Sequence, residues 1–164
     1  MTVRTVTLLA ATVSTGLMAG AFDLYAHTIM PGLAGTDDRT FVGSFQAMDR
    51  AIINPWFIGG TFLGALALTL SAAVANRGEP AFVWVAVALA AYIVAVVVTA
   101  AVHVPLNDAI KAAGNPDSIS DLAGVRARFG EARWAAWNLV RVVTTTGAFA
   151  CLTWALVLRG RASA

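Results

Sequence analysis

The sequence predicts an all-α integral membrane protein, an antiparallel four-helix bundle with a short amphipathic interfacial helix between spans one and two. Composition is the first ground for this fold class. Hydrophobic residues make up 59% of the 164 residues and charged residues only 12%, whereas a typical soluble domain has ~45–50% apolar and ~25% charged residues. A soluble domain this small could not cover its surface with so few charges. The same figures exclude a disordered chain, a collagen, a coiled coil and a disulfide scaffold.

Four apolar stretches are the second ground, and they supply the predicted spans. They occupy residues 5–22, 55–75, 81–102 and 134–158. A hydrocarbon core of ~30 Å needs ~20 helical residues to cross it, and all four stretches are long enough, the first being the shortest. Helices are expected because a lone span in lipid must satisfy its own backbone hydrogen bonds. The whole chain, residues 1–164, is therefore predicted to form one four-span domain.

The first stretch has an alternative interpretation as a cleaved signal peptide. Arg4 precedes its apolar region, and small residues end it, as such a leader requires. We favour a retained span, because Gly16 and Gly20 are four residues apart and suit close packing against another helix. Gly60 and Gly64 in the second stretch predict close packing in the same way.

The connections between the spans have unequal lengths. Residues 76–80 join the second and third spans and force an antiparallel hairpin. The other two connections are long and lie on the opposite side from the termini. In the first of them, Phe41, Phe45 and Met48 recur at helical spacing, which predicts the interfacial amphipathic helix within residues 37–53. Residues 118–134 have few breakers and are predicted to run as a helix into the fourth span.

Charge gives conflicting indications of orientation. The side with the termini carries four arginines against Glu79 alone, whereas the long-loop side carries seven Lys and Arg residues mixed with eight acidic ones. The positive-inside rule counts Lys and Arg, and by that count the long loops would be cytoplasmic. We discount the count because several of those arginines look committed to an internal polar cluster. We predict that both termini are cytoplasmic, in an inner membrane of bacterial type.

The net charge and the cysteine count exclude some binding partners and leave others open. The formal net charge is only +2, with no basic run, so nucleic-acid binding has no support. The single cysteine, Cys151, says nothing about redox compartment. The partners expected are the lipid bilayer and a hydrophobic small-molecule substrate or ligand, with assembly into a homo-oligomer left open.

Polar residues collect at the long-loop end of every predicted span, although polar groups at membrane depth are costly. Arg141 lies about two turns inside the fourth span, where an unpaired arginine costs at least ~2.5–3.5 kcal/mol. It is either half of a structural ion pair, with Asp23 nearest in depth, or a fixed cation that stabilises an anionic substrate or intermediate. The residues that helical spacing brings to this end are Asp23, His27, Asn54, His103, Asn107, Arg133, Trp137, Asn138 and Arg141.

Two histidines at equal depth beside carboxylates suggest a general base or a metal site. No Glu-x-x-His or His-x-x-His spacing is present, so we predict no metal and no cofactor. The candidate catalytic residues are His103, His27 and Arg141. The candidate substrate-binding residues are Asn54, Asn107, Trp137, Asn138, Arg133 and Asp23.

Three motifs in order resemble the anthrone oxygenase-like (noranthrone monooxygenase-like) family of small four-span membrane proteins. Residues 45–55 (FQAMDRAIINP) resemble the family segment after the first span, and residues 104–107 (VPLN) its element after the third. Trp134, Trp137, Asn138 and Arg141 resemble its signature in the last span. The resemblance implies a four-helix membrane fold and, for some fungal members, oxidation of anthrones to anthraquinones with molecular oxygen. It carries over Asn54, Pro55, Pro105, Leu106, Asn107, Trp137, Asn138 and Arg141, and neither histidine.

Two hypotheses from different classes follow. The first is a small membrane oxygenase or oxidoreductase acting on a lipophilic, ionisable, anthrone-like compound in a polar pocket at the long-loop end, where it would work as a cofactor-independent monooxygenase. The second is a non-catalytic membrane subunit or ligand-binding bundle whose polar cluster only fixes helix register. Whether the chain is an enzyme stays open at this stage.

Overall fold

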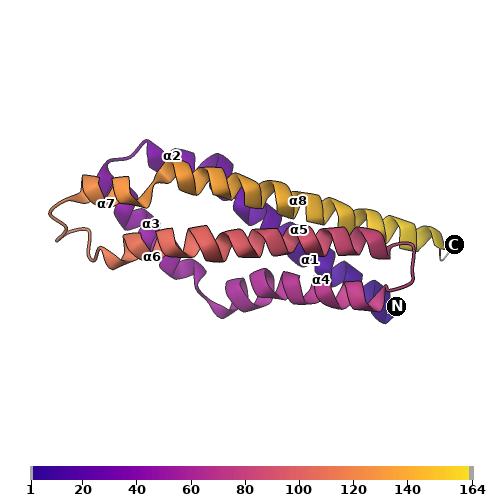
Figure 1. Ribbon diagram of the computed structural model, residues 1–164. Coiled ribbons are helices and arrows are strands. Elements are labelled where there is room, and N and C mark those ends of the chain that lie inside the picture. Colours follow the sequence, from indigo (N-terminus) through magenta and orange to yellow (C-terminus); the bar gives the residue numbers. More distant parts are fainter. Residues whose placement is uncertain (1, 163–164) are drawn as a thin grey trace.

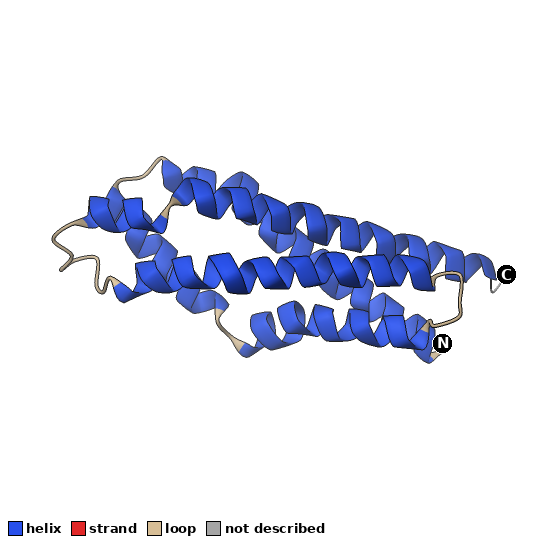
Figure 2. Ribbon diagram, viewed as in Figure 1, coloured by secondary structure: helices blue, strands red, loops and turns tan. Residues whose placement is uncertain are grey.

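The computed structural model describes residues 2–162 of the chain, and the described part is helical with connecting loops and turns (Figures 1 and 2). The predicted single domain of residues 1–164 includes residues 1, 163 and 164, which lie outside the described residues. The α-helices are α1 (Val3–Leu24), α2 (Met30–Ala34), α3 (Asp38–Ile52), α4 (Leu63–Ala75), α5 (Phe82–Val98), α6 (Val104–Ala112), α7 (Leu122–Phe129) and α8 (Glu131–Ala162). Three π-helical segments connect some of them, namely η1 (Tyr25–Ile29), η2 (Trp56–Phe62) and η3 (Thr99–His103).

Four helical segments are long and apolar enough to cross a membrane, so the predicted all-helical membrane fold is confirmed. They are Val3–Ala34, Trp56–Ala75, Phe82–Ala112 and Leu122–Arg161. Three of them extend beyond the predicted bounds at the long-loop end, because polar helical turns continue there past the apolar stretch.

The spans pack in a ring in which α1 contacts α4 and α8, and α5 contacts the same two helices. Both described ends of the chain lie at one end of the molecule, together with the short α4–α5 connection (Figure 1). The core between the spans combines small side chains, which let the helix backbones approach closely, with the larger rings of Phe22, Phe62 and Tyr92. Its fully buried members include Leu8, Ala11, Ala65, Val85 and Leu152.

The other end of the molecule is closed by a cap made of α2, α3, α6 and α7. The predicted amphipathic helix is present as α3, and Asp37 caps its first turn by accepting a hydrogen bond from the Thr40 N–H at 3.0 Å. The Thr40 hydroxyl also donates to Asp37 Oδ2 at 2.6 Å, and this bond, with the one from the Thr40 N–H, holds the pKa of the Asp37 carboxyl below its usual range. The apolar face of α3, including Phe41 and Phe45, is buried against the rest of the cap in a second apolar cluster.

A glycine divides the last long helical region. The sequence predicted one helix running from residue 118 into the fourth span, but α7 ends at Gly130, which adopts a left-handed conformation with φ of +69°. A side chain is strained in that conformation, so glycine permits a stop that hydropathy does not reveal. The fourth span proper is α8, which begins at Glu131.

Close packing of the spans was predicted at two glycine pairs, Gly16 with Gly20 and Gly60 with Gly64, and the structure shows it only at Gly16. A Cβ on Gly16 would come within 2.9 Å of the Phe149 ring on α8, so this glycine does make room for a neighbouring helix. A Cβ on Gly20 would meet nothing within 4 Å, and those on Gly60 and Gly64 would meet only their own span. The prediction for these three glycines was wrong, because spacing alone does not show which side of a helix faces a neighbour.

The three π-helical segments lie at the cap end of three different spans. Each contains a backbone hydrogen bond from an N–H to the carbonyl oxygen five residues earlier, such as Met30 N–H to Tyr25 O and Val104 N–H to Thr99 O. In η1 and η3 a proline follows one residue after the segment, at Pro31 and Pro105. A proline ring collides with the carbonyl four residues earlier and removes an amide donor, and a wider turn relieves both problems. The wide turns displace the side chains that come after them from simple α-helical phase.

Candidate functional site

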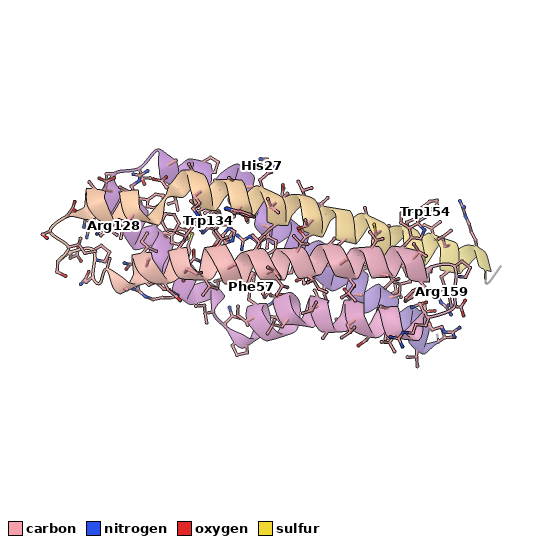
Figure 3. The ribbon with its side chains drawn as sticks, viewed as in Figure 1. His27, Phe57, Arg128, Trp134, Trp154 and Arg159 are labelled. Atoms are coloured by element: carbon pink, nitrogen blue, oxygen red, sulfur yellow. The ribbon has the colours of Figure 1, made fainter. Side chains whose placement is uncertain are left out.

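A partly open cavity of about 160 Å³ lies between the spans and the cap, at the depth of the three π-helical segments. Its wall is mainly apolar, with aromatic rings from several elements. Phe57 and Trp134, both on its wall, lie between the helices in Figure 3. The polar side chains on its wall come from five elements and are Tyr25, Asp49, Thr99, His103, Asn107, Asp108, Lys111 and Arg141.

Arg141 is the buried cation of this cavity, with only 6% of its surface exposed. Its Nη2 donates to Asn138 Oδ1 at 2.7 Å and its Nη1 to Thr99 Oγ1 at 3.3 Å. The guanidinium carbon lies 4.3 Å from the centre of the Phe22 ring and 5.3 Å from that of Trp134. Its Nε has no hydrogen-bond partner. Within residues 2–162 no carboxylate forms an ion pair with it.

Asn138 holds Arg141 in place. It is fully buried, and its Nδ2 donates to the Phe22 carbonyl oxygen on α1 at 3.0 Å. Its Oδ1 is thereby aimed at Arg141, one turn further along α8. Asn138 is absent from the cavity wall, so its place in the structure is behind the guanidinium.

Asp49 on α3 is a buried carboxylate at the cap side of the same cavity, with 7% of its surface exposed. Its Oδ1 accepts a hydrogen bond from Asn107 Nδ2 at 2.6 Å, and Asn107 Oδ1 accepts one from Trp134 Nε1 at 2.9 Å. Asp49 Oδ2 lies 2.7 Å from Lys111 Nζ. Each carboxylate oxygen has two lone pairs, so these two contacts leave one lone pair on each oxygen of Asp49.

His103 contributes a ring rather than a free nitrogen to the cavity. Its Nδ1 lies 3.4 Å from the Val98 carbonyl oxygen and its Nε2 lies 3.3 Å from the Trp134 carbonyl oxygen. Its ring also packs edge to face against the Trp134 ring, at 4.9 Å between centroids. Both nitrogens therefore face backbone oxygens, and 1% of the residue is exposed.

The structure leaves five sequence-predicted site residues off the cavity wall, in addition to Asn138. His27 and Asp23 form a pair 3.2 Å apart on an exposed face, and Figure 3 shows His27 at the outer edge of the molecule. Arg133 and Trp137 are exposed on α8. Asn54 caps the start of the second span, where its Oδ1 accepts from the Phe57 N–H at 2.9 Å.

The exposure of Asp23 and His27, away from the cavity, has a simple physical reason. The polar face of Gly16, Gly20, Asp23 and His27 was expected to point into the bundle. The buried residues of α1 are instead apolar or small, among them Met18 and Phe22. The exposed Asp23–His27 pair lies at the end of the span, where the interfacial region of a bilayer begins and polar groups are tolerated.

Several residues of the cavity wall were not among the predicted site residues, including Tyr25, Asp49, Asp108, Lys111 and Trp134. Asp49 and Lys111 lie on amphipathic helices outside the apolar stretches, where charged residues usually face water. A signal was available for Asp49, because it falls at the end of the apolar face of α3, four residues after Phe45. Across residues 2–162 no three His, Cys, Asp or Glu side chains are grouped closely enough to hold a metal ion.

Four apolar spans and a cavity beneath a helical cap define a helical integral membrane protein with an internal site. The chain belongs to the anthrone oxygenase family, whose model matches residues 54–151, more than half of its length. The match includes Thr99, Asn107 and Arg141, and it begins after α1 and α3, which it leaves out. No curated protein and no solved structure matches the chain.

Proposed function

We propose that this protein is a membrane oxygenase that oxidises a lipophilic, ionisable carbon acid of the anthrone type in the cavity beneath the cap. One observation carries the proposal: Arg141 is buried on the wall of an apolar cavity, and no carboxylate of residues 2–162 forms an ion pair with it. A buried charge without a partner is costly, so a site that keeps one favours an anionic ligand. Family membership supports the reaction type.

The chemistry suits a site of this composition. Loss of a proton from the methylene carbon of an anthrone leaves a carbanion whose charge is shared with the carbonyl oxygen. That anion can react with molecular oxygen directly. The methylene becomes a carbonyl and dioxygen supplies one oxygen atom to it and one to water, so the reaction balances without an added reductant.

The residues divide into complementary roles in this proposal. Arg141 stabilises the developing oxyanion, because a preorganised donor in a dry site acts most strongly where charge develops. Asn138 fixes the direction of the guanidinium. The aromatic rings of Phe22 and Trp134 give the flat substrate an apolar surface and exclude water.

The experiment is oxygen uptake by the purified protein in detergent, with anthrone as substrate and anthraquinone as product. We expect one molecule of oxygen consumed for each molecule of anthraquinone formed, at a rate proportional to protein concentration and above the spontaneous oxidation. The Arg141→Leu variant should lose most of this rate.

Two results would count against the proposal. A rate no higher than spontaneous oxidation, over a range of anthrones, would remove the enzyme assignment. Tight binding of the anthrone anion without turnover would instead support the alternative, a ligand-binding bundle.

A further inference from the structure

We propose that Asp49 is the general base of this site, which neither the family match nor the sequence motifs assign. The inference rests on the proposed function and deepens it by naming the group that takes the proton. Asp49 is a buried carboxylate on the cavity wall and comes from α3, outside the matched residues 54–151. Among the residues described here, it is the buried carboxylate that shares a cavity with Arg141.

The two histidines are poorly placed for the same task. A base needs a free lone pair within reach of the proton it takes. Both ring nitrogens of His103 face backbone carbonyl oxygens, and His27 lies on an exposed face beside Asp23. Each oxygen of the Asp49 carboxylate, by contrast, has two lone pairs and one polar contact, from Asn107 Nδ2 to Oδ1 at 2.6 Å and from Lys111 Nζ to Oδ2 at 2.7 Å, so a second lone pair remains on each.

The surroundings of Asp49 hold its carboxylate in a fixed direction. Asn107 donates to Oδ1 and is itself held by Trp134 Nε1, so the carboxylate is oriented by a chain of two hydrogen bonds. Lys111 keeps a positive charge beside it, and Lys111 Nζ also lies 3.1 Å from Asp108, whose side chain is 62% exposed.

The positions of base and oxyanion donor along the bundle suit the proposed substrate. Arg141 is hydrogen-bonded to Thr99 and Asp49 to Asn107, and these two partners are eight residues apart on one span. At 1.5 Å per residue, eight helical residues rise about 12 Å. In an anthrone the carbonyl and the methylene lie on opposite sides of the central ring. With a hydrogen bond at one end and a proton-transfer contact at the other, the reacting groups span about 10 Å, which is close to that rise.

The reaction can then be written with Asp49 as the proton carrier. Asp49 takes one methylene proton, and the electron pair left on carbon is delocalised onto the oxygen facing Arg141. Dioxygen accepts electrons from this carbanion and forms a carbon–oxygen bond, and Asp49 returns the proton to the terminal peroxide oxygen. Asp49 next takes the second proton from the same carbon while the oxygen–oxygen bond breaks. The hydroxide that leaves receives this proton, which gives water and restores the carboxylate.

The experiment separates proton removal from oxygen chemistry. Anthrone is incubated without oxygen in D₂O with the purified protein, and deuterium at the methylene carbon is followed by mass spectrometry. Wild-type protein should accelerate exchange above background. Asp49→Asn should lower the accelerated rate at least ~100-fold, because a positioned general base contributes typically 100- to 10,000-fold. Asp49→Asn should still bind the anion of 1-hydroxyanthraquinone, whose site is Arg141.

Three further variants keep the test decisive. Asp49→Asn combined with Lys111→Met removes the pair without leaving an unpaired ammonium, and it should be folded and equally slow. His103→Gln tests the alternative base, and it should lower exchange far less than Asp49→Asn does. Asp117→Asn, which removes an exposed carboxylate paired with Arg39, should leave the rate unchanged.

The outcomes distinguish this inference from the proposed function. Exchange and oxygen uptake at wild-type rates in both Asp49 variants would overturn the role of Asp49 and leave the oxygenase assignment intact. Loss of exchange in His103→Gln with a normal rate in Asp49→Asn would give the role to His103. If wild-type protein neither exchanges nor oxidises anthrones, the proposed function itself fails.

Discussion

Replacement of Arg141 by leucine should separate stability from function. The variant loses the hydrogen bond to Asn138 at 2.7 Å, and a buried amide oxygen left unsatisfied costs ~1–3 kcal/mol. The lost contacts with the Phe22 and Trp134 rings add ~1–2 kcal/mol. Against this, the variant no longer buries an arginine without a carboxylate, and that desolvation penalty is several kcal/mol. The opposing effects are of similar size, so we expect the free energy of unfolding to change by no more than about 2 kcal/mol.

Activity should respond very differently. Loss of one oxyanion donor typically costs ~2.7–4 kcal/mol of transition-state stabilisation, or ~100- to 1,000-fold in rate. Thermal unfolding in detergent and anthrone turnover, measured on the same preparation, give the two quantities. Arg128→Leu is the matched control, because it removes an exposed arginine on α7 and should alter neither.

A specific result would refute this reasoning. A stability loss of ~3–5 kcal/mol is typical when one partner of a buried ion pair is removed. If Arg141→Leu behaved in that way while keeping normal turnover, Arg141 would be a structural ion-pair partner. Asp23→Asn provides an independent check, because Asp23 pairs with His27 and should show no energetic coupling to Arg141 in a double-mutant cycle.

Three further predictions concern the fold and its orientation. Gly130→Ala should lower stability by ~1–2 kcal/mol in thermal unfolding, because its φ is +69°, whereas Gly160→Ala, where a Cβ would meet nothing within 4 Å, should not. Asp37 contributes stability above its ordinary pKa of 3.8, and this contribution is lost as the pH falls through its lower folded pKa. Amide exchange in α3 should therefore increase only at acidic pH. Unchanged protection of α3 at acidic pH would contradict the role of Asp37 as its N-terminal capping residue. The double variant Asp117→Cys with Cys151→Ser should react with a membrane-impermeant maleimide in intact cells, because the long loops are predicted to face outward. Labelling only after lysis would reverse the predicted orientation.

The membrane fold could be predicted because its signals are local. Apolar stretches of spanning length and the amphipathic spacing of Phe41 and Phe45 each follow from the sequence without knowledge of neighbours. The break at Gly130 was missed because one glycine in a polar helix has no effect on hydropathy. The wide turns before Pro31 and Pro105 were missed because sequence periodicity assumes a constant helical phase.

The site was predicted unevenly, for a physical reason. Arg141, Asn107 and His103 lie within or just after apolar stretches, where any polar residue attracts notice, and all three line the cavity. His27 attracted the same notice but lies at a span end where exposure is tolerated. Asp49 was overlooked as a site residue because its burial depends on Asn107 and Lys111, which are distant in sequence and meet it only in the folded chain.

The apolar interior of this protein is divided into two clusters that share no residue. One cluster joins the spans, and the other joins α3, α6 and α7 to the ends of the first and fourth spans. Cooperative opening follows contiguous apolar packing, so the cap can loosen as its own unit while the spans stay assembled. In the proposed function, substrate entry and product release then require work against the smaller cluster and the polar contacts within the cap, while the packing of the spans is left in place. The time that a product stays bound is thus a property of the cap, and changes in its packing should alter turnover without any change in the residues that perform the chemistry.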